Sequence, residues 1–123
     1  TKTGGFWPGY YVTHAEVDFC LRVKNKGLRV VYYPGTSVRH IEKVNPIKRE
    51  RLYYLYRNKL ILIHRNFPFF QKFVAISLII LFGLPFYLLE SVNFNKKLVF
   101  SEWGLILLSV WHGLLMKEGR LQR

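Results

Sequence analysis

Two acidic residues near the N-terminus, Glu16 and Asp18, are the first candidates for chemistry, because no other Asp or Glu occurs in the first forty residues. A carboxylate can take the proton of an attacking hydroxyl as a general base. A shared metal ion is disfavoured, since side chains two positions apart on a helix point to nearly opposite faces. We expect each acid to act alone. Helix capping is the alternative for Glu16, and a solvated acid or a salt-bridge partner for a nearby base is the alternative for Asp18.

The histidines and the cysteine give weaker signals. His14 lies four positions before Asp18, a spacing compatible with a metal-binding pair on one helical face. His40 lies in a loop after a predicted strand, where α/β folds place ligand groups, and a structural or exposed histidine is the alternative. The other two histidines receive no role, and Cys20 lies on an apolar stripe where it is expected to pack. The sequence has no P-loop, GxGxxG, GxSxG or CxxC pattern, so motifs alone assign no enzyme class.

Local signals predict three elements in the first part of the chain. A helix is expected over 14–26, with Thr13 capping its start and Gly27 ending it in the left-handed conformation. The β-branched and aromatic run 28–34 predicts a strand that is apolar enough to be covered on both faces. A second helix is expected over 46–66. Helix, glycine turn and strand in this order indicate an α/β fold in which helix predominates.

The first part of the chain is basic and the second part is apolar. Residues 1–72 carry fourteen Lys or Arg against four Asp or Glu, within a net charge of +12. Residues 73–90 predict a transmembrane helix and 98–116 a second apolar helix, so 67–123 is expected to be a membrane-associated helical tail. A buried core helix is the alternative. Basic residues are typical of the cytoplasmic side of a membrane segment.

A nucleic-acid partner is the other class that a basic, tyrosine-rich chain admits. The sequence has no RNA-recognition or zinc-finger signature, and the basic residues are explained by the membrane segment that follows them. We therefore expect no nucleic-acid partner. The single cysteine excludes an internal disulfide framework and favours a reducing compartment.

The order of motifs over 3–66 resembles the acceptor-side block of family 2 glycosyltransferases, with rhamnosyltransferase-like bacterial members the most similar. The block runs as GGF, then the acidic motif HAEVDFCLR, then the strand-like LRVVYYP followed by a histidine, and then YYLYRN at 53–58. The resemblance implies that 1–66 is the acceptor-side, C-terminal part of the catalytic domain of such an enzyme. The implied fold is the C-terminal part of a GT-A-like domain followed by membrane-associated helices.

Within this resemblance, Glu16 stands where the family has the aspartate that acts as general base toward the acceptor hydroxyl. Glu16 is one methylene longer than that aspartate, and Ala15 replaces a frequent acid before it. Asp18 matches the second acid, which supports the helix and neighbouring bases, and it is counted among the substrate-binding candidates. Arg22 matches the arginine of the same motif, with an implied structural role.

The remaining site residues come from the other motifs of the block. Gly4, Gly5 and Phe6 match the loop that shapes the acceptor site. His40 matches a histidine that in some members helps to hold the divalent cation or the diphosphate. Arg57 belongs to the RN pair, whose implied role is structural or adjacent to the diphosphate, and it is counted as substrate-binding.

The resemblance implies an inverting transfer of a sugar from a nucleotide-sugar donor to a lipid-linked or glycan acceptor. It places the enzyme at the cell membrane, with the catalytic part in the cytoplasm. It also implies a divalent cation, Mg²⁺ or Mn²⁺, whose main ligands and nucleotide-binding half are missing from these 123 residues, so this chain alone is expected to be inactive. The opening run TKTGGFWPG suggests a segment of a larger protein. The alternative function is a non-catalytic basic membrane protein that binds anionic lipid or scaffolds partners.

Overall fold

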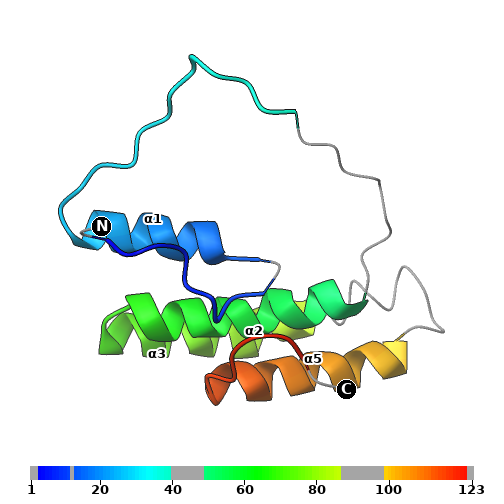
Figure 1. The fold of residues 1–123 in the computed structure, drawn as a ribbon. Coiled ribbons are helices and arrows are strands. Elements are labelled where there is room, and N and C mark those ends of the chain that lie inside the picture. The colour runs from blue at the N-terminus through cyan, green and yellow to red at the C-terminus, as the bar shows by residue number, and fades with distance from the viewer. Residues whose placement is uncertain (1–2, 12, 40–48, 87–98, 122–123) are drawn as a thin grey trace.

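The computed structural model describes residues 3–11, 13–39, 49–86 and 99–121, which are mainly helical (Figure 1). The helices predicted over 14–26, 46–66 and 98–116 are confirmed as helices for the residues that the structure describes. In chain order the elements are α1 (Ala15–Asn25), α2 (Arg49–Asn66), α3 (Phe69–Leu78), the π-helical turn η1 (Ile79–Gly83) and α5 (Val99–Leu114).

Helix α2 is the centre of the fold, because α1, α3 and α5 each pack against it. In Figure 1, α5 runs along one side of α2, α3 folds back beside α2, and the N-terminal loop lies between α1 and α2. A surface helix keeps one face in water, whereas α2 buries most of its circumference, as a central helix must. The apolar side chains that α2 buries are Leu52, Tyr53, Tyr54, Tyr56, Leu60, Ile61, Leu62 and Ile63.

Small residues of α5 allow this helix to approach α2 closely. A Cβ atom on Gly113 would lie 2.9 Å from the Cβ of Leu60 and 3.0 Å from the backbone oxygen of Arg57. Ser109, one helical turn earlier, is fully buried and donates its hydroxyl to the carbonyl of Ile106 at 2.6 Å. Two small residues four positions apart form a flat stripe that brings helix backbones together.

The segment that follows α5 turns back and contacts the N-terminal loop, so the two ends of the described chain lie together. The backbone N–H of Gly119 donates to the carbonyl of Gly9 at 3.0 Å. The carbonyl of Gly119 in turn accepts a hydrogen bond from Nη1 of Arg57 at 2.5 Å. Met116 packs against a small apolar cluster with Tyr10 and Trp7 of the N-terminal loop. The C-terminal segment therefore lies against both the loop and α2.

The start of α1 differs from the predicted capping arrangement. The N-cap is His14, in the left-handed conformation at φ 72°, and no side chain caps the helix. The prediction for Thr13 is wrong because tertiary contacts use its hydroxyl, which lies 2.9 Å from Nδ1 of His14 and accepts from Asn58 at 3.3 Å. The prediction for Gly27 is confirmed, since it adopts φ 73° and its N–H donates to Lys24 at 2.9 Å.

The predicted strand over 28–34 does not form, and the α/β class and the GT-A-like domain predicted with it are wrong for the residues that the structure describes. Those residues contain helices and no strand. Residues 28–33 instead run as an exposed arc away from the helices, with Tyr32 89 % exposed (Figure 1). A strand needs a neighbour to accept and donate its backbone hydrogen bonds, and the described part of the chain supplies none.

One helix, Phe69–Phe86, is long and apolar enough to cross a membrane. At 1.5 Å per residue its 18 residues span about 27 Å, close to the hydrocarbon thickness of a bilayer. Only 6 % of this helix is buried, which argues against the alternative of a buried core helix. It begins four residues before the predicted 73–90, and 87–98 lie outside the described residues.

The prediction of two membrane-associated helices is wrong for the described residues, because among them only Phe69–Phe86 is long and apolar enough to cross a membrane. The apolar part of α5, Trp103–Leu114, is shorter. It packs against α2, with Ile106 and Ser109 buried.

Candidate functional site

The carboxylate of Asp18 is the centre of a buried polar network between α1 and the end of α2. Its Oδ2 accepts from Nε of Arg22 at 2.8 Å, and its Oδ1 accepts from Nδ2 of Asn66 at 2.8 Å and from the hydroxyl of Tyr10 at 3.3 Å. Nε of Arg65 lies 3.5 Å from Oδ1. Asp18 is fully buried, so the salt-bridge alternative holds for it, and a role in substrate binding stays a prediction.

These partners keep Asp18 ionised. Burial by itself raises the pKa of Asp18, but hydrogen bonds from Asn66 and Arg22 and the charges of Arg22 and Arg65 outweigh it, so the pKa falls below its usual value. Burial, followed by the negative charge of Asp18, raises the pKa of Tyr10 well above 10, so its hydroxyl remains a donor. Two guanidinium groups, an amide and a phenol therefore hold one carboxylate in place.

Arg22 connects this network to the glycine loop. Its Nη1 donates to the carbonyl of Thr3 at 2.7 Å and its Nη2 donates to the carbonyl of Gly5 at 2.8 Å. Gly4 adopts φ 69°, which favours glycine. Phe6 is 65 % exposed, although its ring packs against Phe19 of α1 at 5.2 Å between centroids. The loop that the resemblance assigns to the acceptor site is thus held by Arg22 and Phe19, while the side chain of Phe6 stays largely exposed.

The RN pair of α2 fixes the chain that leads into α1. Asn58 is fully buried, and its Nδ2 donates to the carbonyls of Tyr11 at 3.0 Å and Thr13 at 2.9 Å. Its Oδ1 accepts from Nε and Nη2 of Arg57 at 3.0 and 2.7 Å. Asn58 thereby holds the backbone just before α1, and Arg57 orients Asn58. The structure assigns both residues a scaffold role, while substrate binding by Arg57 stays a prediction.

Glu16 lies in the first turn of α1 and is exposed. Its charge acts on neighbouring His14, whose pKa is lowered by burial and by Lys59 while Glu16 opposes that shift. Residues three apart are neighbours on a helix surface, so Glu16 adjoins Phe19, the ring against which Phe6 packs. Glu16 and Phe6 therefore both adjoin Phe19 of α1, and the catalytic role of Glu16 stays a prediction.

The role of His40 in metal binding stays a prediction. His40 lies outside the described residues. Within the described part of the chain, no group of three or more His, Cys, Asp or Glu side chains could hold a metal ion. His14 and Asp18, the alternative pair, already contact Thr13 and the network above.

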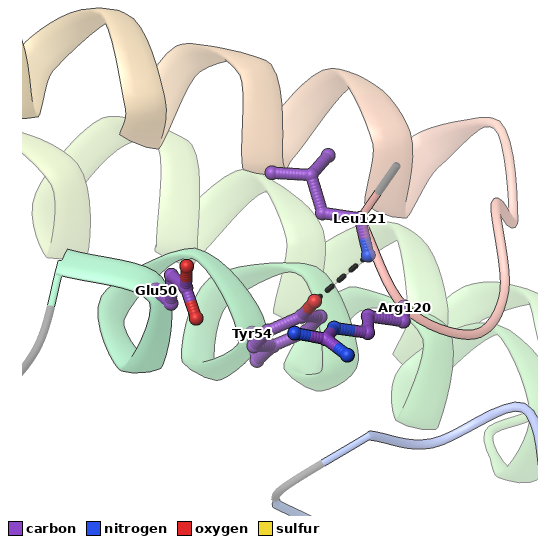
Figure 2. A pocket seen from close by; sticks show the side chains of 4 residues that line it. All are labelled: Glu50, Tyr54, Arg120 and Leu121. Atoms are coloured by element: carbon purple, nitrogen blue, oxygen red, sulfur yellow. Dashed lines mark hydrogen bonds between the residues drawn. The ribbon is translucent and has the colours of Figure 1, made fainter. Parts of the chain in front are cut away.

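A second candidate site, which the sequence did not predict, lies between α2, the end of α5 and the C-terminal segment. Its cavity has a volume of about 440 Å³. A neighbouring cavity of about 250 Å³, bounded by Glu50 and Tyr54 of α2, shares Arg120 and Leu121 with it (Figure 2). Figure 2 shows the N–H of Leu121 donating to the hydroxyl of Tyr54, at 2.8 Å. The larger cavity is lined by Tyr53, Arg57, His112, Lys117, Glu118, Arg120 and Leu121.

His112 is neutral in this cavity. Its Nδ1 lies 2.6 Å from the hydroxyl of Tyr53 and its Nε2 lies 3.4 Å from Nζ of Lys117. An ammonium group can only donate, so Nε2 accepts and the ring proton sits on Nδ1. Burial, then the charges of Lys117 and Arg57, lower the pKa of His112, which agrees with this tautomer. No sequence motif signals the site, because its two halves lie about sixty residues apart.

Comparison with known proteins adds no relative. The chain matches no family model, no curated protein and no solved structure. The similarity to family 2 glycosyltransferases therefore rests on the order of motifs over 3–66.

Proposed function

We propose that residues 1–66 are the acceptor-side part of an inverting, membrane-associated family 2 glycosyltransferase, with Glu16 as the general base. One observation supports this most directly. The motif residues that the resemblance singles out, although separated in sequence, join in hydrogen-bonded networks that fix the glycine loop and the start of α1. Glu16 remains outside these networks' buried core, exposed beside the loop. A site of this kind needs such a division between rigid support and an accessible base.

The proposed chemistry is one displacement at the anomeric carbon of the donor sugar. The acceptor oxygen forms the new glycosidic bond while its proton passes to the carboxylate of Glu16. The bond from the anomeric carbon to the diphosphate breaks, and the nucleoside diphosphate leaves with the electron pair. The gain of one bond and the loss of the other on opposite faces give inversion.

The described residues do not fit the divalent cation that the resemblance implies. Asp18 already accepts from Arg22 and Asn66, and no acid cluster accompanies it in the described part. Under this proposal, the main groups that bind the donor and the cation lie outside the described residues or in another chain, and His40 stays a predicted contact of the cation or the diphosphate. The part described here contributes the base, the acceptor loop and the membrane contact.

Under this proposal the helix Phe69–Phe86 contacts the cell membrane, and the catalytic part lies in the cytoplasm. Phe69, Phe70 and Phe73 are 85, 75 and 66 % exposed. The helix packs beside α2, which carries buried Arg57, and a bilayer crossing in this packing would bring that charge to membrane depth. We therefore expect Phe69–Phe86 to lie along the membrane surface, near a lipid-linked or glycan acceptor.

The alternative, a non-catalytic basic membrane protein that binds anionic lipid, is favoured by the same exposed helix and by the net charge of +12. The two functions make different predictions for Glu16. A lipid-binding protein has no need of this carboxylate, and its vesicle binding would weaken with salt.

The test is sugar transfer by the longest natural chain that contains this segment. Replacing Glu16→Gln removes the base, and general-base catalysis contributes about 10²- to 10⁴-fold, so turnover should fall by that range. Glu16→Asp is the matched control, because it keeps the carboxylate and should retain activity. Unchanged turnover in Glu16→Gln refutes the catalytic role. Absence of transfer with any nucleotide sugar, together with salt-sensitive vesicle binding, supports the alternative.

A further inference from the structure

The larger cavity beside α5 contains more positive charge than its own residues neutralise. Among the residues that the structure describes, three cations line it, Arg57, Lys117 and Arg120, against one acid, Glu118. Both ion pairs among the described residues go to Asp18, so within that part of the chain no carboxylate lies within 4.0 Å of these three cations. With His112 neutral, the lining residues that the structure describes have a net charge of +2.

Arg57 forms a rigid floor for this cavity. Its side chain is only 1 % exposed, and it is anchored by Oδ1 of Asn58 and the carbonyl of Gly119. Its guanidinium lies over the ring of Tyr54, 4.9 Å from the centroid, and 5.6 Å from that of Tyr53. A buried guanidinium held by neutral groups keeps its full charge and is preorganised for an anion.

The other donors surround this floor. Lys117 and Arg120 are exposed, so their long side chains can adjust to a ligand. The Nδ1 proton of His112 is directed to the oxygen of Tyr53, so the hydroxyl hydrogen of Tyr53 is available for another acceptor. Fixed and adaptable donors thus converge on one volume.

We propose that this cavity binds a phosphate-bearing anion, a phosphate monoester or a diphosphate. A monoester carries about −1.5 to −2 charge at pH 7, which matches the net charge of +2 on the lining. A volume of about 440 Å³ is within the range of small-ligand pockets. The cavity shares Arg57 with the residues that the resemblance counts as substrate-binding, but neither Glu16 nor the glycine loop lines it, so anion binding can be tested apart from sugar transfer.

The direct test is titration of the 123-residue chain, in an uncharged detergent, with inorganic pyrophosphate. Binding is followed by calorimetry and by the ¹⁵N signals of His112, identified by their loss in His112→Gln. The negative charge of the bound anion offsets Lys117 and Arg57, so the pKa of His112 should rise on saturation. If pyrophosphate neither binds saturably nor raises that pKa, and vesicles with phosphate-monoester lipid also do not bind in preference to zwitterionic ones, the proposal is overturned.

Two charge-matched double variants separate a built site from general attraction. Lys117→Gln/Arg120→Gln removes two lining cations, and loss of their charge-assisted hydrogen bonds should weaken binding about tenfold or more. Lys24→Gln/Arg29→Gln removes two exposed cations on and after α1 and should change binding less than about twofold. Equal weakening by both variants refutes the site. Far-UV circular dichroism checks folding, and the His112 titration of the unaltered chain decides the matter if the variant does not fold.

Vesicles separate the two sources of the phosphate. Phosphatidic acid presents a monoester, whereas phosphatidylserine presents a diester at a similar surface charge density when mixed accordingly. Preference for phosphatidic acid that Lys117→Gln/Arg120→Gln abolishes assigns the site to a lipid headgroup. Pyrophosphate binding without that preference assigns it to a soluble diphosphate.

Discussion

Replacing Asp18→Asn tests the network that supports the candidate site. The substitution conserves shape but removes the charge that Arg22 and Arg65 share. All the hydrogen bonds to the carboxylate are donated to it, and they come from Arg22, Asn66 and Tyr10. The amide of an asparagine would bring a donor of its own, so at least one partner would face another donor across a buried contact.

The magnitude follows from burial. Removing one partner of a buried ion pair costs about 3–5 kcal/mol. The side chains of Arg22 and Arg65 are 22 and 29 % exposed, so water compensates them in part. We therefore expect a smaller loss than this range, about 2–3 kcal/mol in the free energy of unfolding. Small domains have about 5–15 kcal/mol in total, so this loss is a large fraction.

The assay is urea unfolding in an uncharged detergent, followed by circular dichroism and by tryptophan fluorescence. Trp7 is a local reporter, because the guanidinium of Arg65 lies 3.7 Å from the centroid of its ring. Glu16→Gln is the control, since it removes the same charge two residues away at an exposed position and should change stability by less than about 0.5 kcal/mol. If both variants shift the urea midpoint equally, the network does not stabilise the fold as argued.

Three further outcomes are expected. Gly113→Ala should destabilise the chain by about 1–3 kcal/mol, because the new Cβ meets Leu60 and the backbone of Arg57. Gly104→Ala is the control, since the space around Gly104 is open, and it should be neutral or stabilising by about 0.5–1 kcal/mol. Equal melting temperatures of the two variants would contradict the close packing of α5 on α2. Asn58→Ala should lower the free energy of unfolding by about 2–3 kcal/mol and expose the chain before α1 to proteolysis. Asn25→Ala, at an exposed position, should have neither effect. Similar digestion of both variants would refute the scaffold role of Asn58. Burial lowers the pKa of His14, His64 and His112, so the unfolded chain binds protons more readily than the native chain. The free energy of unfolding should therefore be at its full value above about pH 6.5 and should fall as the pH drops through the native pKa values. Melting temperatures between pH 7.5 and 5 would show this fall, and a flat profile would contradict it.

The sequence by itself determined the helices, because the signals of a helix are local. The apolar spacing of α2 and the glycine after α1 involve residues within a few positions of one another, and each hydrogen bond of a helix closes over four residues. The same logic located the apolar helix near Phe69–Phe86 within a few residues. Asp18 also had a nearby base, Arg22, one helical turn away, so a salt bridge was among the predicted alternatives.

Only the tertiary structure decided the features that join distant parts of the chain. The run 28–34 has the composition of a strand, but pairing requires a second strand that the described residues do not supply. Thr13 is suited to cap α1, yet Asn58, forty-five residues away, uses its hydroxyl instead. The cation-lined cavity combines Arg57 with His112 and Lys117, residues that come together because Gly113 lets α5 pack closely on α2. Patterns within one turn of chain cannot specify such contacts, since these depend on which helix faces meet after folding.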